Sequence, residues 1–411
     1  MARKIKDLQQ RFDGIAELKN KFHLTERHES TRHDRRPDRE THSFVQASEV
    51  IGRDQEKQRI VNKLTRDDVA AADEEDIPVL PIVGIGGIRH VYLLNSDSSK
   101  GSASEFLKKL GHARTLRFPY MGNGPTQKSF LETCLRRFQH LRMLDVFGST
   151  FEVLPEWIGD LKHLGISTFV TVATSRKSPT PSLPKDMRYM TSLRCLSLTT
   201  KQRDLNGHGL EHLKSLQFLI IWGCENLEHL FEGIHKLTFL HTLGVANCRN
   251  LVSLPHGLNR LTALKTLVIG ICGKLDLSTT HGSQEKEDDD DNQGFNLQSL
   301  ETTDLPKLEA LPHWLLRRSA NSLRNVTIKH CENLTASSEW HNLTSLEKVE
   351  IAGCPRLSSL PKTMQRLKQL HIGGCPILSE RCRQEIGVDW PKIAHASLIV
   401  LDGHKISVED D

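Results

Sequence analysis

The sequence has few aromatic residues, only 5% of the chain, whereas leucine recurs throughout it. This composition suits a fold built from repeated aliphatic layers. No apolar run approaches the roughly 18 to 20 residues that span a bilayer, and the first residues contain no signal-peptide core. We therefore expect a soluble, cytoplasmic protein without a membrane span.

The sequence also lacks the pattern of a disulfide framework, because its nine cysteines are an odd number and none forms a C-x-x-C pair. Such spacing favours free thiols in a reducing compartment. The net charge is also small, because 55 basic and 51 acidic residues leave only +4. The basic residues within 26–40 alternate with acidic ones, which predicts a solvated linker and no nucleic-acid partner.

A complete phosphate-binding loop is missing as well. Residues 78–88 predict a buried strand that runs into glycines, and the candidate nucleotide-binding residues are Gly84, Gly86 and Gly87. A working loop continues to a lysine that meets the phosphate charge and a hydroxyl that holds magnesium. His90 and Val91 stand at those two positions. We therefore expect an inactive remnant, with no ADP or ATP cofactor and no ATPase activity.

What the sequence does contain, from about residue 138, is the repeated template L-x-x-L-x-[LIV]-x-x-C-x-x-L-x-x-L. Three consecutive units, spaced 24 residues apart, begin at Leu216, Leu240 and Leu264. Further units begin at Leu141, Leu193, Leu297, Leu323, Leu346 and Leu367. This is the leucine-rich repeat pattern, in which each unit adds one short strand to a solenoid and buries its leucines against its neighbours.

Other patterns within the repeats receive structural interpretations. One cysteine per unit at the inward turn position indicates packing, so we expect no metal site. Two segments, 165–190 and 278–295, interrupt the rhythm, and the acidic run in the second predicts an extruded loop, because it lacks the spacing of a calcium loop. Residues 398–402 imitate a magnesium-binding strand, but their place after the last repeat predicts a capping strand. No nucleophile motif is present, so we expect no catalytic residue and no enzyme activity.

Strand alternation predicts which residues face the concave side of the solenoid. The unit at Leu216 differs from the others because its outward positions are apolar. The candidate partner-binding residues are Phe147, Phe218, Ile220, Trp222, Lys348 and Glu350. An exposed apolar cluster often marks a contact site, but the same residues could pack against a flanking loop or the 165–190 segment. Both interpretations stay open at this point.

The front of the chain carries apolar residues at three- and four-residue intervals over 5–22, which predicts a helix of coiled-coil type. This helix, the segment 41–54, the strand and glycines of 77–87, and repeats of the C-x-x-L type together resemble the plant coiled-coil NLR disease-resistance proteins, particularly those of grasses. Most of the family's nucleotide-binding domain is missing. The fold class we expect is an α/β solenoid, a leucine-rich repeat horseshoe preceded by a short helical segment and a truncated nucleotide-binding-domain fragment.

The resemblance implies four regions. Residues 1–45 would be a coiled-coil remnant and charged linker, and 46–88 a truncated NB-ARC start with a broken P-loop. Residues 89–137 would be a junction and a first, degenerate repeat, and 138–411 the leucine-rich repeat domain with the acidic loop 278–295.

The resemblance also implies a function in plant innate immunity, by protein–protein recognition through the repeats. A pathogen effector, a guarded host protein or a full-length NLR relative would be the partner. One alternative is an ADP/ATP-binding NLR switch whose nucleotide domain is lost from this gene model, and ADP retained by the purified protein would support it. Another is an extracellular leucine-rich repeat receptor or inhibitor, suggested by sequons at Asn325, Asn333 and Asn342.

Overall fold

The structure is a computed structural model that describes residues 79–84, 87–93, 112–117, 128–146, 155–169, 187–255, 257–277, 295–335, 342–362 and 364–406. The chain divides into two compact units, Met1–Ala71 and Ala72–Asp411, and every described residue belongs to the second. The predicted coiled-coil helix, the charged linker, the acidic run, Gly86 and Phe147 lie outside the described residues.

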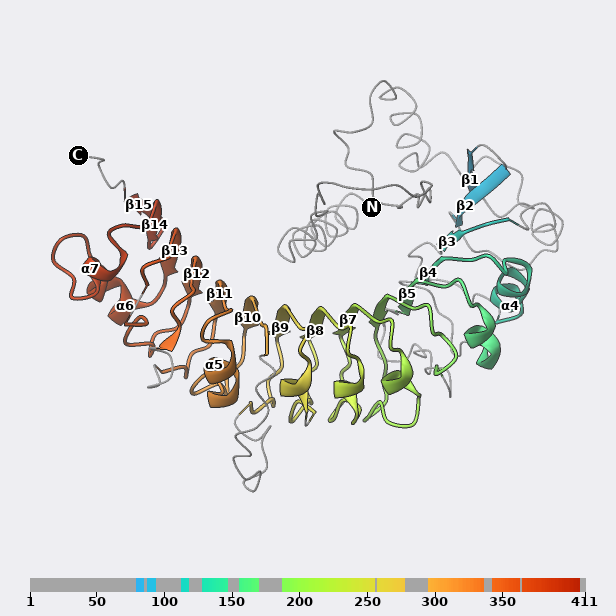
Figure 1. Ribbon diagram of the computed structural model, residues 1–411, viewed down its shortest axis with the longest axis horizontal. Helices are drawn as coiled ribbons and strands as arrows, with labels where there is room; N and C mark the ends of the chain where they lie inside the picture. Colours follow the sequence, from blue (N-terminus) through green and yellow to red (C-terminus); the bar gives the residue numbers. More distant parts are fainter. Residues whose placement is uncertain are drawn as a thin grey trace, which may run out of the picture. The chain divides into compact units, whose positions relative to one another are not determined.

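One sheet organises the described part of the Ala72–Asp411 unit. Its 15 strands follow one another in sequence order, and they lie on the inner, concave side of a curved stack (Figure 1). Pairing is parallel from β2 to β14 and antiparallel at the two ends, where β1 pairs with β2 and β14 pairs with β15. The strands are β1 (Val79–Gly84), β2 (Gly87–Leu93), β3 (Thr115–Arg117), β4 (Met143–Asp145), β5 (Ile166–Phe169), β6 (Cys195–Leu198), β7 (Phe218–Trp222), β8 (Thr242–Ala246), β9 (Thr266–Gly270), β10 (Ser299–Thr303), β11 (Asn325–Lys329), β12 (Lys348–Ala352), β13 (Gln369–Gly373), β14 (Leu398–Leu401) and β15 (His404–Ile406).

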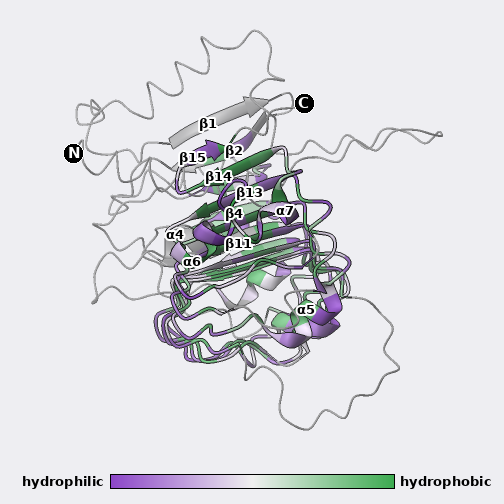
Figure 2. Cartoon of the chain, turned by 90° about the vertical axis from the view of Figure 1, so that its left-hand side faces the viewer, coloured by the Kyte–Doolittle hydropathy of each residue, from purple (hydrophilic) through white to green (hydrophobic). Residues whose placement is uncertain are grey.

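Short helices on the outer side of the stack return the chain from one strand to the next (Figure 1). They are α4 (Lys128–Arg137), the 3-10 helices η3 (Glu156–Asp160), η4 (Leu210–His212), η5 (Ile234–Lys236) and η6 (Leu258–Arg260), and α5 (His313–Ser319), α6 (Pro376–Arg381) and α7 (Trp390–Ile393). Figure 2 shows hydrophobic residues along the stacked strands and hydrophilic residues in many of the peripheral turns.

The core is the continuous aliphatic ladder that the repeat spacing predicts. Leu219, Leu243 and Leu267 stand in register on β7, β8 and β9, and none of the three is exposed. Each buried leucine contributes on the order of 1.5 to 3 kcal/mol, provided that its neighbours cover it. The unit therefore forms the predicted leucine-rich repeat solenoid.

The cysteines of the repeats have the structural role expected for them. Six ladder cysteines are buried, at 224, 248, 272, 331, 354 and 375. Each thiol lies near the carbonyl oxygen two residues earlier, as in the contact of 3.2 Å from Cys272 Sγ to Gly270 O. A weak donor at this position satisfies a turn carbonyl while filling a small apolar space.

Two features of the N-terminal part of the sheet differ from what the sequence analysis expected. β5 lies within the 165–190 segment, so the sheet continues where no clean repeat was visible. The expected boundary between residues 88 and 89 falls inside β2, which pairs both with β1 and with β3. Backbone pairing carries the sheet through both places, although the apolar template is incomplete there.

The last repeat is closed by a hairpin and a buried ion cluster. β14 takes the place predicted for a capping strand, and the Asp402 carboxylate accepts a hydrogen bond of 2.9 Å from the Gly374 amide. Nearby, Asp389 is 0% exposed and pairs with Arg381 and Lys392. Gly387 permits this closure, because a Cβ there would lie 2.2 Å from the Arg381 carbonyl oxygen.

A left-handed residue follows each of the strands β7 to β14, and one of these residues is strained. Glycine and asparagine occupy this position in several repeats, as at Gly223 and Asn247, but Ile271 adopts a φ of 54°. A β-branched residue in this region costs about 1 to 3 kcal/mol. We expect Ile271→Asn to raise the free energy of unfolding by about 1 kcal/mol in urea titrations. Gly353→Ala, at the equivalent position, should lower it, and a gain from both changes would contradict the strain argument.

Candidate functional site

The candidate recognition surface lies on the exposed face of β7. Leu219 and Ile221 are buried, Phe218 and Ile220 are half-buried, and Trp222 is 39% exposed. The predicted alternation is therefore present, with three apolar side chains on the face that carries mostly small or polar residues elsewhere. We call Phe218, Ile220 and Trp222 the apolar face cluster.

The neighbouring strand explains why part of this cluster is covered. Gly244 stands opposite Ile220 in the β7–β8 register, and a Cβ on Gly244 would lie 2.8 Å from Ile220 Cδ1. Ile220 thus lies over the surface that the missing side chain leaves open. Ile220 is therefore partly covered by the next strand, whereas Trp222 remains exposed. Packing of the cluster against a flanking loop or the 165–190 segment stays an open alternative.

Contacts with its backbone carbonyl oxygen hold Trp222 at the end of β7. The Thr199 hydroxyl donates a hydrogen bond of 2.5 Å to the Trp222 carbonyl oxygen, and the Cys224 thiol lies 3.7 Å from the same atom. The indole therefore projects from a backbone position that is fixed on both sides. A residue whose backbone is already ordered loses less conformational entropy on binding.

The two charged candidates belong to a separate place on the face. Lys348 and Glu350 lie on β12, five strand intervals from β7, which corresponds to about 24 Å at about 4.8 Å per interval. Glu350 forms an ion pair of 2.5 Å with Lys329 on β11. The structure does not bring these residues together with the apolar face cluster, so a partner that used both would have to span several repeats.

The glycines of the proposed nucleotide remnant lie in a hairpin. Gly84 and Gly87 form the closing pair between β1 and β2, and Gly86 lies outside the described residues. His90 and Val91, which replace the lysine and hydroxyl positions, continue as strand β2. His90 Nδ1 lies 3.0 Å from Thr115 Oγ1, and Val91 is fully buried. The assignment of these glycines to a nucleotide remnant stays a prediction.

Two of the described thiols are kept in the protonated form by burial. Burial raises the pKa of Cys134 to about 12 and that of Cys195 to about 11. In the described residues, no three histidine, cysteine or acidic side chains gather where they could hold a metal ion. Among the helices described, none is both long and apolar enough to cross a membrane. The strand face itself carries a partly exposed apolar cluster and paired charges.

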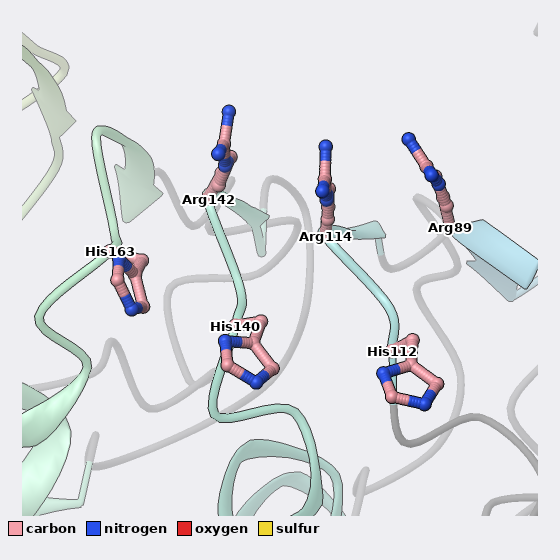
Figure 3. Close-up of a pocket in the computed structure, with 6 residues that line it drawn as sticks. All are labelled: Arg89, His112, Arg114, His140, Arg142 and His163. Carbon is pink, nitrogen blue, oxygen red and sulfur yellow. The ribbon is translucent and has the colours of Figure 1, made fainter. Parts of the chain in front are cut away.

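A cleft near the front of the sheet was not identified from the sequence. It has a volume of about 290 Å³ and is lined by Arg89, His112, Arg114, His140, Arg142 and His163. Figure 3 shows the three arginines side by side in one row and the three histidines in a second row. We call it the basic cleft. The spacing His-x-Arg, at 112–114 and again at 140–142, is the sequence signal that could have revealed it.

The strand register and the buried ladder define a leucine-rich repeat protein, with a partly exposed apolar cluster on its strand face. A family profile described as plant disease resistance protein RPS2-like, leucine-rich repeats, matches residues 234–355. The putative disease resistance protein RGA4 of Solanum bulbocastanum is 35% identical over 88 residues, which are 21% of this chain and 8% of that protein. The repeat region therefore resembles that of plant disease resistance proteins, and the chain matches only a small part of this relative's length.

Among solved structures, the leucine-rich repeat domain of the type III effector XopL aligns over 73% of this chain and 88% of its own, with 17% identity and a TM-score of 0.44. An internalin from Listeria monocytogenes aligns over 70% of this chain and 74% of its own, with 14% identity and a TM-score of 0.41.

Proposed function

We propose that this chain acts in plant defence as a non-catalytic recognition protein, which binds a protein partner on the strand face of its repeats. The observation that carries the proposal is the apolar face cluster, with Trp222 39% exposed on a face of mainly small and polar residues. The match of residues 234–355 to disease resistance repeats supports the defence context. The partner is a pathogen effector, a guarded host protein or a full-length NLR relative.

Physical chemistry favours the apolar face cluster as the anchor. Tryptophan is enriched among the residues that dominate binding energy, because its large ring fills a pocket at low entropic cost. Phe218 and Ile220 stand beside Trp222 on the same strand and extend the apolar area. The ion pair of Lys329 and Glu350 belongs to a charged region that contributes register more than affinity.

The same proposal places the chain in the cytoplasm and without ATPase activity. All nine cysteines are free thiols, and eight of them are buried in the repeats, which suits a reducing compartment. Asn333 donates its side-chain amide to the Pro306 carbonyl oxygen at 2.7 Å, so a glycan at this sequon would break a turn contact. The strand that contains His90 and Val91 supports the absence of a nucleotide site.

The test is partner capture from plant tissue with tagged, full-length chain, comparing wild type with Trp222→Ser. We expect an identified defence protein, or an effector supplied by infection, to be enriched by wild type. Trp222→Ser should reduce its recovery at least tenfold, because a central tryptophan contributes about 2 kcal/mol or more. Binding of the purified partner should weaken by the same factor.

Phe239→Ser is the matched control. Phe239 is an aromatic residue that is 59% exposed. It precedes β8, so it lies outside the strand face that carries the apolar face cluster. Its replacement should leave capture unchanged. Equal loss in both variants, or no loss in Trp222→Ser, would show that the apolar face cluster is not the binding surface.

A further inference from the structure

The basic cleft is built by one position of the repeat, occupied by arginine in successive turns. The Arg114 amide donates to the Arg89 carbonyl oxygen at 2.7 Å, and the Arg142 amide donates to the Arg114 carbonyl oxygen at 2.7 Å. The Gly165 amide continues the series to the Arg142 carbonyl oxygen at 2.9 Å. The backbone ladder therefore fixes the backbone positions of three arginines at strand spacing, about 4.8 Å from one turn to the next. Their side chains lie side by side in Figure 3. We call this position the loop column.

Two residues earlier in each turn, a second column carries the histidines. His112 and His140 precede Arg114 and Arg142, and His163 precedes Gly165. The rings of His140 and His163 lie 5.6 Å apart between centroids. Imidazole N–H groups are further donors, so the two columns form one wall of cationic and hydrogen-bonding groups (Figure 3).

The same loop column is neutralised at the other end of the solenoid. There the successive residues are Arg324, Glu347 and Lys368, joined by amide-to-carbonyl hydrogen bonds of 2.8 Å. The Glu347 carboxylate lies 3.7 Å from Arg324 and 2.7 Å from Lys368. In this part of the loop column, a carboxylate therefore lies between two cations and neutralises part of their charge.

Two of the three arginines of the basic cleft, Arg114 and Arg142, have no such balance among the described residues. All six residues that line it are basic, and neither Arg114 nor Arg142 forms an ion pair with a described carboxylate. Asp145, on β4, pairs instead with Arg117 at 3.2 Å. Partial burial, followed by the charges of Arg142 and Arg89, lowers the pKa of Arg114. The like charges therefore repel one another, and an anion would relieve that repulsion.

From this geometry we propose that the basic cleft binds a small, multiply phosphorylated anion across the first repeats. Guanidinium forks match the oxygens of phosphate groups, and a row of three offers matched donors to adjacent phosphates. A cleft of about 290 Å³ lies near the lower end of ligand pockets and suits a small molecule better than a folded partner. The site is separate from the apolar face cluster and does not depend on the proposed function.

The test is calorimetric titration of the full chain with orthophosphate, pyrophosphate and tripolyphosphate at physiological salt. Affinity should rise along this series, because each added phosphate meets another guanidinium. Arg114→Gln should weaken tripolyphosphate binding at least tenfold. Arg324→Gln removes the same charge from the neutralised part of the loop column, and its affinity should stay within twofold of wild type.

A second variant separates binding from folding. Gly165 has an ordinary backbone conformation, and the atoms nearest to a Cβ there lie 3.8 and 4.0 Å away, so a side chain fits. Gly165→Glu would place a carboxylate beside Arg142. This would reproduce the arrangement of Glu347 beside Arg324 at the other end of the solenoid. We expect it to retain the wild-type melting temperature and to weaken tripolyphosphate binding at least tenfold.

Three outcomes would overturn the proposal. One is wild-type protein that does not bind tripolyphosphate at millimolar concentration. Another is equal affinity in wild type, Arg114→Gln and Gly165→Glu, which would indicate general surface attraction. The third is binding of an acidic peptide with the sequence of residues 285–291 while tripolyphosphate fails to bind, which would assign the cleft to a protein segment.

Discussion

Replacing Asp389 with asparagine is expected to lower the free energy of unfolding by about 3 kcal/mol, because it removes the buried charge that holds two cations at the end of the repeats. The Asp389 carboxylate accepts from Arg381 Nε at 2.7 Å and from Lys392 Nζ at 2.5 Å. The two cationic side chains remain 36% and 29% exposed. They can partly rehydrate, which places the cost at the lower end of the range for broken buried pairs.

The contribution of Asp389 should depend on pH in a defined direction. Burial acts to raise the pKa of Asp389, but the hydrogen bonds from Arg381 and Lys392 outweigh it and hold the pKa below its usual value. Between the folded and unfolded pKa values the unfolded chain binds more protons, so stability rises with pH there. The contribution is fully present above about pH 4 and is lost as the pH falls through the folded pKa. The difference between wild type and Asp389→Asn should therefore shrink in acid.

Urea unfolding of the full chain at pH 7 and at acid pH measures both effects. Glu380→Gln is the control, because Glu380 pairs with Arg383 at 3.8 Å while the two side chains are 74% and 63% exposed. Such a pair contributes about 0 to 1 kcal/mol. If Asp389→Asn were as stable as Glu380→Gln at pH 7, the ion cluster of Arg381, Asp389 and Lys392 would not stabilise the end of the repeats.

The repeat register was predictable because every strand with two core-facing aliphatic residues follows the leucine template. β5 was not recognised, since Gly165 and Ser167 stand where neighbouring turns carry larger residues. The β1–β2 hairpin was not recognised because Gly84 and Gly87 also fit the start of a phosphate loop. A glycine pair permits either structure, and in this fold the strand that follows Gly87 pairs with β3.

The sequence predicted which side chains of the candidate site share the strand face, but not how far each of them is exposed. Alternation alone predicted that Phe218, Ile220 and Trp222 share one face. The exposure of Ile220 depends on the next strand, where Gly244 has no side chain to displace its Cδ1 atom. The basic cleft depends on residues about 25 to 28 positions apart, such as Arg89, Arg114 and Arg142, which become neighbours only when the turns stack. Side-chain contacts between repeats therefore carry the information that single-strand patterns lack.

Truncation of a central ladder leucine should weaken the whole solenoid, and Leu243→Ala is expected to cost about 2 to 5 kcal/mol. Leu243 is fully buried between Leu219 and Leu267, so the cavity would be open to both neighbouring repeats. Repeats are stabilised mainly by contacts with adjacent repeats, and loss at one interface reduces the coupling of the two halves.

The matched control for Leu243→Ala is Val252→Ala, which shortens an aliphatic residue that is 41% exposed in the same turn. It should change the free energy of unfolding by less than about 0.5 kcal/mol. Urea titration followed by circular dichroism gives both values, and hydrogen exchange should show faster exchange of the amides in β7 to β9 for Leu243→Ala alone. Equal costs for the two variants would mean that the central ladder does not hold adjacent repeats together, because only Leu243 lies within it.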